Sequence, residues 1–266
     1  GIWNTIAGQP TDDSGMALLL ARMLVERGTY DPDAARDVYV YWLNSGPFDC
    51  GMTVSSGLCG RPNLDSQANG AMMRVSPLGI FGANHDISQV AEWAQQDAAL
   101  THPYPVCRQA NALFAMVVAH AIRTGAEPRD LHRQILAWAG EMNPEETLLK
   151  AITGAATAPP ADYLRHQGWV LIAFVNALWQ LLHAPNLEEG VVDTVRRGGD
   201  TDTSAAVCGA LLGAVYGRDA IPNQWVECLL NYRPLAGQPR VYRPRPDCFW
   251  PVEALELAEP LVSPDL

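Results

Sequence analysis

Positive charge is scarce in this 266-residue chain, and nearly all of it comes from arginine. Lys150 is the only lysine, and 18 Lys and Arg residues stand against 29 Asp and Glu residues, giving a formal net charge of −11. Proteins that bind nucleic acid through its phosphate backbone need clustered positive charge. The composition therefore argues against a general nucleic-acid-binding protein.

Long apolar runs are missing as well. No segment approaches the roughly 20 consecutive apolar residues that cross a bilayer. No charged n-region followed by an apolar h-region marks a signal peptide. We therefore expect a cytoplasmic protein with no membrane segment. The chain begins at Gly1 rather than Met, from which we expect that it is a fragment of a longer protein.

Paired cysteines are absent too. The six cysteines are far apart in the sequence, and none forms a C-x-x-C pair: Cys50, Cys59, Cys107, Cys208, Cys228 and Cys248. This spacing excludes a zinc ribbon and indicates no disulfide framework. We interpret the cysteines as reduced, mostly buried thiols of a cytosolic protein.

Strand signals are weak, whereas helical periodicity runs through most of the chain. Hydrophobic residues make up 48% and charged residues 18%, and this length is near the upper limit for one hydrophobic core. Apolar positions recur at three and four residues. They predict helices over 14–27, 32–44, 86–100, 105–124, 128–140, 145–154, 167–183, 203–216 and 221–231. The sequence thus predicts one compact all-α domain over residues 1–266, with nine or more helices.

Three long connections separate these helices: 45–85, 155–166 and 232–251. The first carries seven glycines and little helical period, and loops of this length in a compact domain are often functional. The third is rich in proline and arginine. We expect it to wrap the surface.

Two clusters of oxygen-bearing side chains lie at predicted helix starts. Thr11-Asp12-Asp13 precedes the helix at 14–27, and Gly198-Gly199-Asp200-Thr201-Asp202-Thr203 precedes the helix at 203–216. Asp and Thr are ordinary N-caps, and carboxylates favour the positive end of a helix dipole. One cap needs one such residue, however, and adjacent carboxylates repel each other unless a cation neutralises them.

The alternative to two caps is a metal site. Mg²⁺ and similar hard ions prefer oxygen ligands. Two clusters brought together could hold a pair of ions about 3.5–4 Å apart, a spacing that activates water and orients an oxygen-rich substrate. The Gly198-Gly199 pair favours this interpretation because it lets the backbone approach closely.

These motifs resemble those of the ADP-ribosylglycohydrolases, the family that includes dinitrogenase reductase-activating glycohydrolase. The second cluster, continuing into 209–214, is similar to the family's C-terminal signature, and Thr11-Asp12-Asp13-Ser14 to its N-terminal metal motif. Asn69-Gly70, with the residues up to Leu78, resembles the central loop. Asp49-Cys50-Gly51 and Thr101-His102 fit in order and spacing, so the resemblance spans residues 8 to 217.

The resemblance implies an all-α domain with two divalent ions, Mg²⁺ or Mn²⁺, in a central cleft. It assigns Thr11, Asp12 and Asp13 to one ion, and Asp200, Asp202 and Thr203 to the other, with Asp202 shared. The implied substrate is ADP-ribose attached to a protein side chain, often arginine. The implied catalytic residues are Asp12, Asp13, Asp49 and Asp202. The implied substrate-binding residues are Asp49, Gly51, Asn69, Gly70, Met73, His102 and Trp169.

The residues themselves suit this chemistry. Cleavage of a glycosidic bond develops positive charge at the anomeric carbon, so the site must place water and stabilise that charge. Asp49 could orient the ribose or take part in proton transfer. Asn69 and Gly70 would present amide groups to the pyrophosphate or ribose. Trp169 could pack on the ligand.

Four of the implied site residues, Asp49, Asn69, His102 and Trp169, have a plainer structural explanation. Asp49 lies in a segment with turn chemistry, and Asn69 before Gly70 is an ordinary turn dipeptide. His102, directly before Pro103, could simply cap or buttress a helix. Trp169 heads an apolar stripe that suits core packing.

Two departures from the family pattern stand out. The family begins with a Gly-rich helix carrying a Gly-Asp pair and a loop that can supply a glutamate, whereas residues 1–10 contain no acid. The domain is therefore expected to lack the family's N-terminal helix. Met52 stands where relatives often carry a polar residue, which leaves the preferred leaving group open.

The sequence is compatible with three functions. The first is a metal-dependent hydrolase that removes ADP-ribose from a modified arginine. The second acts on another conjugate, such as serine-linked, nucleic-acid-linked or small-molecule ADP-ribose. The third is a non-catalytic relative that binds ADP-ribose or serves a structural role. The intact acidic clusters favour the first two, since a structural protein has no need of them.

Overall fold

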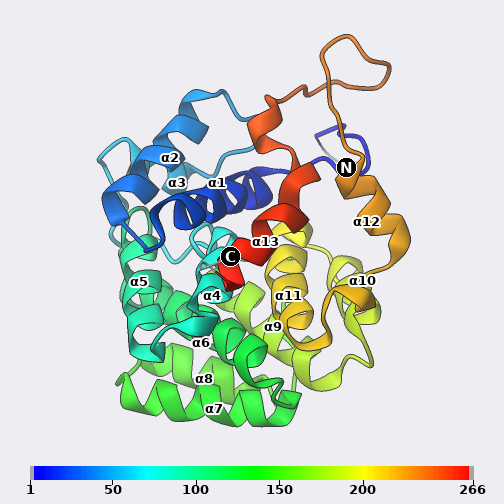
Figure 1. Cartoon of the computed structure of the whole chain (residues 1–266). Coiled ribbons are helices and arrows are strands. Elements are labelled where there is room, and N and C mark those ends of the chain that lie inside the picture. Colours follow the sequence, from blue (N-terminus) through cyan, green and yellow to red (C-terminus); the bar gives the residue numbers. More distant parts are fainter. Residues whose placement is uncertain (1–2, 264–266) are drawn as a thin grey trace.

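The computed structural model describes residues 3–263, and within them the chain forms thirteen α-helices and no β-strand. Figure 1 shows the helices packed around one another. Their bounds are α1 Asp12–Arg27, α2 Pro32–Asn44, α3 Met52–Leu58, α4 Ser76–Phe81, α5 Ile87–Ala99, α6 Pro105–Thr124, α7 Pro128–Glu141, α8 Glu146–Gly154, α9 Val170–His183, α10 Leu187–Arg196, α11 Thr201–Tyr216, α12 Asn223–Leu230 and α13 Ala254–Val262. The all-α prediction is confirmed.

Several predicted boundaries were wrong. Helices α1 and α11 begin at Asp12 and Thr201 rather than at residues 14 and 203, so the acidic clusters lie in the first helical turns. Helix α9 begins three residues later than expected, and α12 two. Short helices α3 and α4 were missed because they are too brief to show a period, and α13, which contains Pro260, was missed as well.

Helix α10 was also missed, although the sequence carries a signal for it. The Asn186 side chain accepts a hydrogen bond from the backbone N–H of Glu189 at 2.9 Å. A side-chain oxygen at the N-cap that bonds the third helical residue is a common helix start. An Asn followed three residues later by Glu is therefore the signal that could have located α10.

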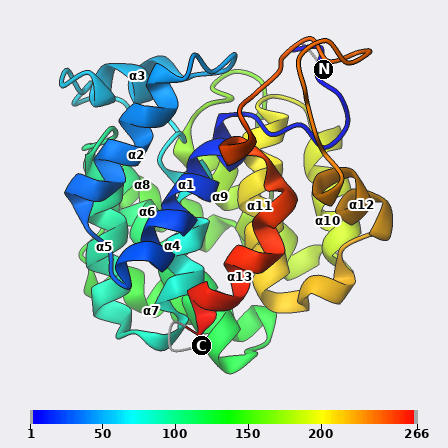
Figure 2. The same cartoon turned by 45° about the horizontal axis from the view of Figure 1, so that its top comes forward.

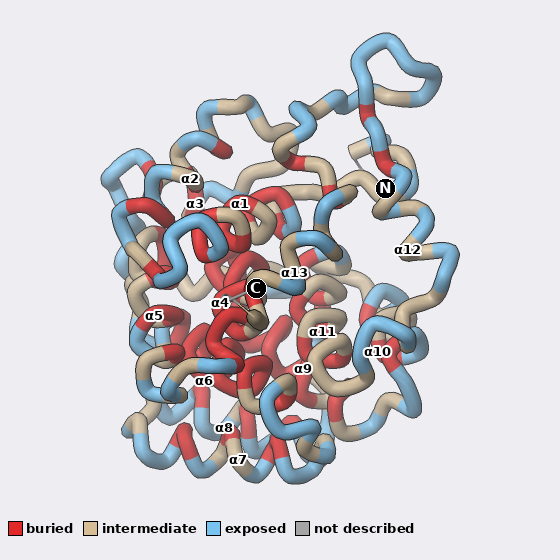
Figure 3. The backbone as a smooth tube through the Cα atoms, viewed as in Figure 1, coloured by how far each residue is buried: buried red, intermediate tan, exposed pale blue. Residues whose placement is uncertain are grey.

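The core surrounds α6, which packs against α4, α5 and α11. Most of its residues are buried, and Figure 3 shows buried segments gathered in the helices around it. Gly79 of α4 makes one of these contacts close, since a Cβ at this position would lie 2.7 Å from Cβ of Val118. Helix α9 is buried along almost its whole length and packs against α11. One continuous core thus fixes α11, which carries the second acidic cluster.

Helix α1 brings the first cluster to the same place. It packs against α2, α4 and α11, and its apolar residues Met16, Leu20 and Leu24 are fully buried. Figure 2 shows α1 and α11 on either side of the red α13. The N-terminal turns of two core helices therefore present their acidic side chains from a rigid base.

The N-terminal segment and the segment that follows α12 lie together, as Figure 2 shows. Gln9 Nε2 donates to the carbonyl of Arg243 at 2.6 Å. Most of the Pro- and Arg-rich segment at 232–244 is exposed, in keeping with the surface course expected for it. Arg245 turns inward, however, and its Nη2 donates to Ser45 Oγ at 2.8 Å.

The cysteines are all free thiols, as expected, but they are not mostly buried. Only Cys107 and Cys208 are buried, three others are partly exposed, and Cys59 is exposed. Within residues 3–263, no helix combines the length and apolarity of a membrane span.

Candidate metal and substrate site

Both acidic clusters open on one cleft of about 940 Å³. The cleft is lined by eleven of the predicted site residues: Thr11, Asp12, Asp49, Gly51, Asn69, Gly70, Met73, His102, Asp200, Asp202 and Thr203. Asp13 and Trp169 are not among the lining residues, and Met52 lines the cleft with 87% of its surface exposed. The fold thus brings together residues as far apart in the chain as Thr11 and Thr203, 192 positions.

The first cluster does not behave as an ordinary helix cap. Thr11 is the N-cap of α1, but its side chain makes no capping hydrogen bond. Its Oγ1 instead donates to Asp13 Oδ2 at 2.7 Å. Asp13 is only 3% exposed, and its other oxygen, Oδ1, has no hydrogen-bond partner. A buried carboxylate oxygen without a donor is costly unless a ligand satisfies it.

The second cluster departs from capping in the same way. Asp200 is the N-cap of α11 and makes no side-chain capping bond either. Its Oδ2 accepts from Asn69 Nδ2 at 2.7 Å, which ties the cluster to the central Asn-Gly loop. In both clusters the N-cap side chain therefore bonds to another side chain and not to the backbone of the first turn of its helix.

Gly199 sets the backbone of the second cluster, and its replacement should be costly. Its φ is +77°, and a Cβ there would lie 1.9 Å from the carbonyl oxygen of Tyr163. We expect Gly199→Ala to lower the stability by about 3 kcal/mol, because it adds both backbone strain and a clash with main-chain atoms. Gly213→Ala is the matched control in α11, since a Cβ there meets no atom within 4 Å. Equal midpoints of thermal unfolding for the two variants would contradict this explanation.

Burial and mutual repulsion raise the pKa values of the carboxyl groups in this site. Burial, together with the charges of Asp13 and Asp49, raises the pKa of Asp12 to about 8. Burial and the charge of Asp202 raise the pKa of Asp13 to about 7. Burial also raises the pKa values of Asp49 and Asp200, with Asp202 adding to both. These carboxylates therefore resist ionisation until a cation joins them.

The protein itself provides no such cation. In the part of the chain that the structure describes, none of these five carboxylates forms an ion pair with an Arg or Lys side chain. Among the same residues, no three His, Cys, Asp or Glu side chains already form a metal-binding group. Binding of an ion would therefore require these carboxylate side chains to move closer together. The all-oxygen donor set and the unpartnered Asp13 oxygen fit a hard divalent ion.

Asp49 lies at the mouth of the cleft beside two aromatic rings. Trp3 lines the cleft together with Asp49 and packs against Phe48 with ring centroids 6.0 Å apart. Thr5 and Gln9 line the cleft too. Sequence reasoning missed this N-terminal contribution because residues 1–10 carry no acid and no helical period.

The central loop is fixed by pairing with the start of α9. The N–H of Asn69 donates to the carbonyl of Gly168, and the N–H of Val170 to that of Gln67, both at 2.9 Å. Gly70 then packs directly on His102, because a Cβ at Gly70 would lie 3.1 Å from its Cε1. His102 is fully buried, so it contributes to the cleft wall from beneath Gly70 and does not cap a helix at the surface.

Trp169 lies apart from the acidic residues. It is the N-cap of α9, 37% exposed, and its Nε1 donates to Gln67 Oε1 at 2.9 Å. It lines two neighbouring pockets with Arg165 and His166, whereas Gln167 and Gly168 line the main cleft. The structure thus places this ring beside the cleft and not inside the core.

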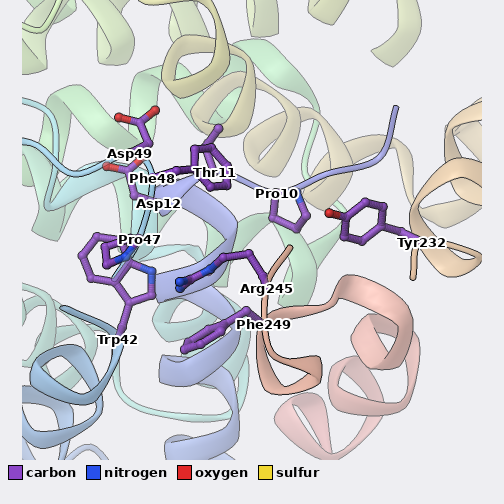
Figure 4. A pocket seen from close by; sticks show the side chains of 11 residues that line it. Pro10, Thr11, Asp12, Trp42, Pro47, Phe48, Asp49, Tyr232, Arg245 and Phe249 are labelled. Atoms are coloured by element: carbon purple, nitrogen blue, oxygen red, sulfur yellow. The ribbon is translucent and has the colours of Figure 1, made fainter. Parts of the chain in front are cut away.

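A small enclosed pocket lies behind Asp12 and Asp49. Figure 4 shows Arg245 beside Trp42 and Phe249, with the Asp49 carboxylate at the opposite end. The guanidinium carbon of Arg245 lies 4.4 Å from the centre of the Phe249 ring. Burial lowers the pKa of Arg245. This arginine secures the C-terminal segment and does not neutralise the acids.

Comparison with known proteins extends these local likenesses to nearly the whole chain. The family model described as ADP-ribosylglycohydrolase matches residues 1–247. The ADP-ribosyl-[dinitrogen reductase] glycohydrolase of Rhodospirillum rubrum is 29% identical over 233 residues, covering 84% of this chain and 74% of that protein. The ADP-ribosylarginine hydrolase Tri1 of Pseudomonas putida (strain GB-1) is 27% identical over 246 residues, covering 85% and 64%. A solved ADP-ribosylglycohydrolase-related protein complex has a TM-score of 0.77 at 28% identity, covering 97% of this chain and 83% of that one.

Proposed function

This chain belongs to the ADP-ribosylglycohydrolase family, and from that premise we propose that it cleaves ADP-ribose from modified arginine side chains with the help of two divalent ions. That it is an enzyme acting on ADP-ribosylated substrates follows from the family and from its named relatives. The arginine linkage, the ions and the roles of individual residues are the proposal.

The observation that carries the proposal is that four carboxylates without a cationic partner line one cleft, Asp12, Asp49, Asp200 and Asp202, with that of Asp13 buried next to Asp12. Thr11, Asp12 and Asp13 would hold one ion; Asp200, Asp202 and Thr203 would hold the other, with Asp202 shared. Such ions, Mg²⁺ or Mn²⁺, supply positive charge that orients ribose hydroxyls and makes water a better nucleophile.

The remaining roles belong to side chains around the ions. Asp49 is half-buried with a raised pKa, and it lies at the mouth of the cleft. It can orient the ribose or exchange a proton with the reacting groups. Gly51, Asn69, Gly70, Met73 and His102 form the wall along which the rest of ADP-ribose would lie. Trp169 would contact the part of the ligand that leaves the cleft.

Two features support arginine as the side chain that carries ADP-ribose. Two relatives have names that specify an ADP-ribosylated protein or arginine. In this chain, the Asp49 carboxylate lies beside the rings of Trp3 and Phe48. A carboxylate next to aromatic rings suits a planar cation such as guanidinium.

A substrate panel tests the proposal. At equal enzyme concentration, we expect release of ADP-ribose from an arginine-linked substrate to exceed release from a serine-linked one by at least about tenfold. Excess EDTA should abolish the release, and Mg²⁺ or Mn²⁺ should restore it. Faster cleavage of the serine-linked substrate would favour another conjugate, and the exposed Met52 at the rim would then be the first residue to exchange. Undiminished release in EDTA would refute the role of the ions.

A further inference from the structure

A buried polar network lies behind the central loop, away from the acidic clusters. Arg74 and Asp97 are both fully buried and form an ion pair, with Arg74 Nε donating to Asp97 Oδ2 at 3.1 Å. Tyr39 donates to the other oxygen of Asp97 at 2.8 Å, and its ring lies 4.3 Å from the Arg74 guanidinium carbon. A buried ion pair needs such additional bonds to offset its desolvation.

The network reaches the cleft through two consecutive residues. Arg74 Nη1 donates to Thr101 Oγ1 at 3.0 Å, and Thr101 Oγ1 lies 2.7 Å from His102 Nδ1. The guanidinium can only donate, so Thr101 accepts that bond. Within residues 3–263, His102 Nδ1 is the one remaining partner of the Thr101 hydroxyl. Thr101 donating to Nδ1 leaves only Nε2 of this group without a partner, whereas the reverse direction leaves both the Thr101 hydroxyl proton and Nε2 without one.

This assignment leaves the imidazole proton on Nε2. A neutral histidine carries one N–H, and an Nδ1 that accepts a hydrogen bond has none. Burial and the nearby charge of Arg74 lower the pKa of His102 to about 3, which keeps the ring neutral at physiological pH. The Nε2 atom is buried and has no hydrogen-bond partner.

The position of the unpartnered Nε2 is set by Gly70. A Cβ at Gly70 would lie 3.3 Å from His102 Nε2, and also 2.8 Å from Val54 Cγ2. All three residues line the cleft. Gly70 and Val54 thus pack over this end of the ring, and a ligand oxygen comes within hydrogen-bonding range of Nε2 when the Val54 side chain turns aside.

We propose that Arg74, acting through Thr101, holds His102 as the tautomer with its proton on Nε2, which donates a hydrogen bond to an oxygen of bound ADP-ribose. Arg74, Asp97, Tyr39 and Thr101 are therefore positioning residues, and His102 is a fixed donor rather than a general base. The ligand half of this inference rests on the proposed function, whereas the tautomer follows from the network.

The tautomer is measured directly by two-dimensional ¹H–¹⁵N correlation spectra of the histidine rings in the full chain at pH 7. The chain has six histidines, and the signals of His102 are assigned from their loss in His102→Gln. We expect Nδ1 to resonate as an unprotonated nitrogen and Nε2 as a protonated one. A proton on Nδ1 would overturn the proposal, and no variant needs to fold for that result to count.

The role of Thr101 is tested with a matched pair of variants. Thr101→Val keeps the shape but loses the hydroxyl, and Thr101→Ser keeps the hydroxyl. We expect mixed tautomers and about tenfold weaker binding of ADP-ribose in Thr101→Val, because one hydrogen bond to the ligand is no longer held in place. Thr101→Ser should restore both. An unchanged tautomer and unchanged affinity in Thr101→Val would contradict the proposal.

Comparison of ADP-ribose with ADP identifies the oxygen and separates this inference from the proposed function. An equal loss of affinity for both ligands assigns the accepting oxygen to the ADP portion. A loss for ADP-ribose alone assigns it to the distal ribose. A wild-type protein that binds neither ligand would refute the proposed function. A wild-type protein that binds them with its proton on Nδ1 would refute only the tautomer.

Discussion

Replacement of both Asp200 and Asp202 by Asn should lower the rate of ADP-ribose release by about a thousandfold or more. The double variant keeps the size of both side chains but removes two of the carboxylates that would hold the ions. Ions that orient the substrate and activate water contribute several kcal/mol to lowering the barrier. The measurement is the initial rate of ADP-ribose release from an arginine-linked substrate, at saturating Mg²⁺ or Mn²⁺.

Asp86→Asn is the control for this experiment. Asp86 is also the N-cap of a helix, α5, and it also makes no side-chain capping bond, but it is exposed and does not line the cleft. Its replacement should leave the rate unchanged. A double variant at Asp200 and Asp202 that keeps its activity within a few-fold of wild type would show that the clusters are not the catalytic site.

In metal-free buffer, the protein should lose stability as the pH rises from about 4 to about 8. The pKa values of Asp12 and Asp13 are raised to about 8 and about 7, far above the ordinary value near 3.8. Between those limits the folded state binds more protons than the unfolded state, so the free energy of unfolding falls with rising pH. Each unit of pKa difference corresponds to about 1.4 kcal/mol.

Divalent ions should reverse this loss. A bound ion stabilises the ionised carboxylates, so excess Mg²⁺ should raise the midpoint of thermal unfolding more at pH 8 than at pH 5. The midpoint is measured by calorimetry across this pH range in EDTA and in Mg²⁺. An Asp12→Asn, Asp13→Asn variant should show a flatter pH profile in EDTA. A midpoint that rises from pH 5 to pH 8 in EDTA, with no response to the ion, would contradict the electrostatic account.

The parts of the fold that could be predicted are those with long periodic signals. Helix α6 was located to the residue because twenty residues with a continuous apolar face leave little freedom in its bounds. Helices α3 and α4 span seven and six residues, too few to establish a period. Their formation depends on tertiary packing, such as the contact of Gly79 with Val118.

The acidic clusters could be found from the sequence because their residue types are conspicuous at helix starts. Their failure to cap those helices could not, since it depends on side-chain rotamers and on partners such as Asn69, 131 residues from Asp200. Trp3 and the pairing of Arg74 with Asp97 gave no sequence signal either. A single tryptophan in an irregular segment and a buried ion pair become visible only when distant helices are packed.

The most direct test of the site is calorimetric titration of Mg²⁺ and Mn²⁺ into metal-stripped protein, with and without ADP-ribose. Ions and sugar that share one cleft must strengthen each other's binding by the same factor. We therefore expect ion binding that tightens when ADP-ribose is present, and ADP-ribose binding that tightens when ions are present. The Asp200→Asn, Asp202→Asn variant should lose this coupling. Ion binding that is absent, or that is indifferent to ADP-ribose, would contradict the central claim that the two acidic clusters and the cleft form one site.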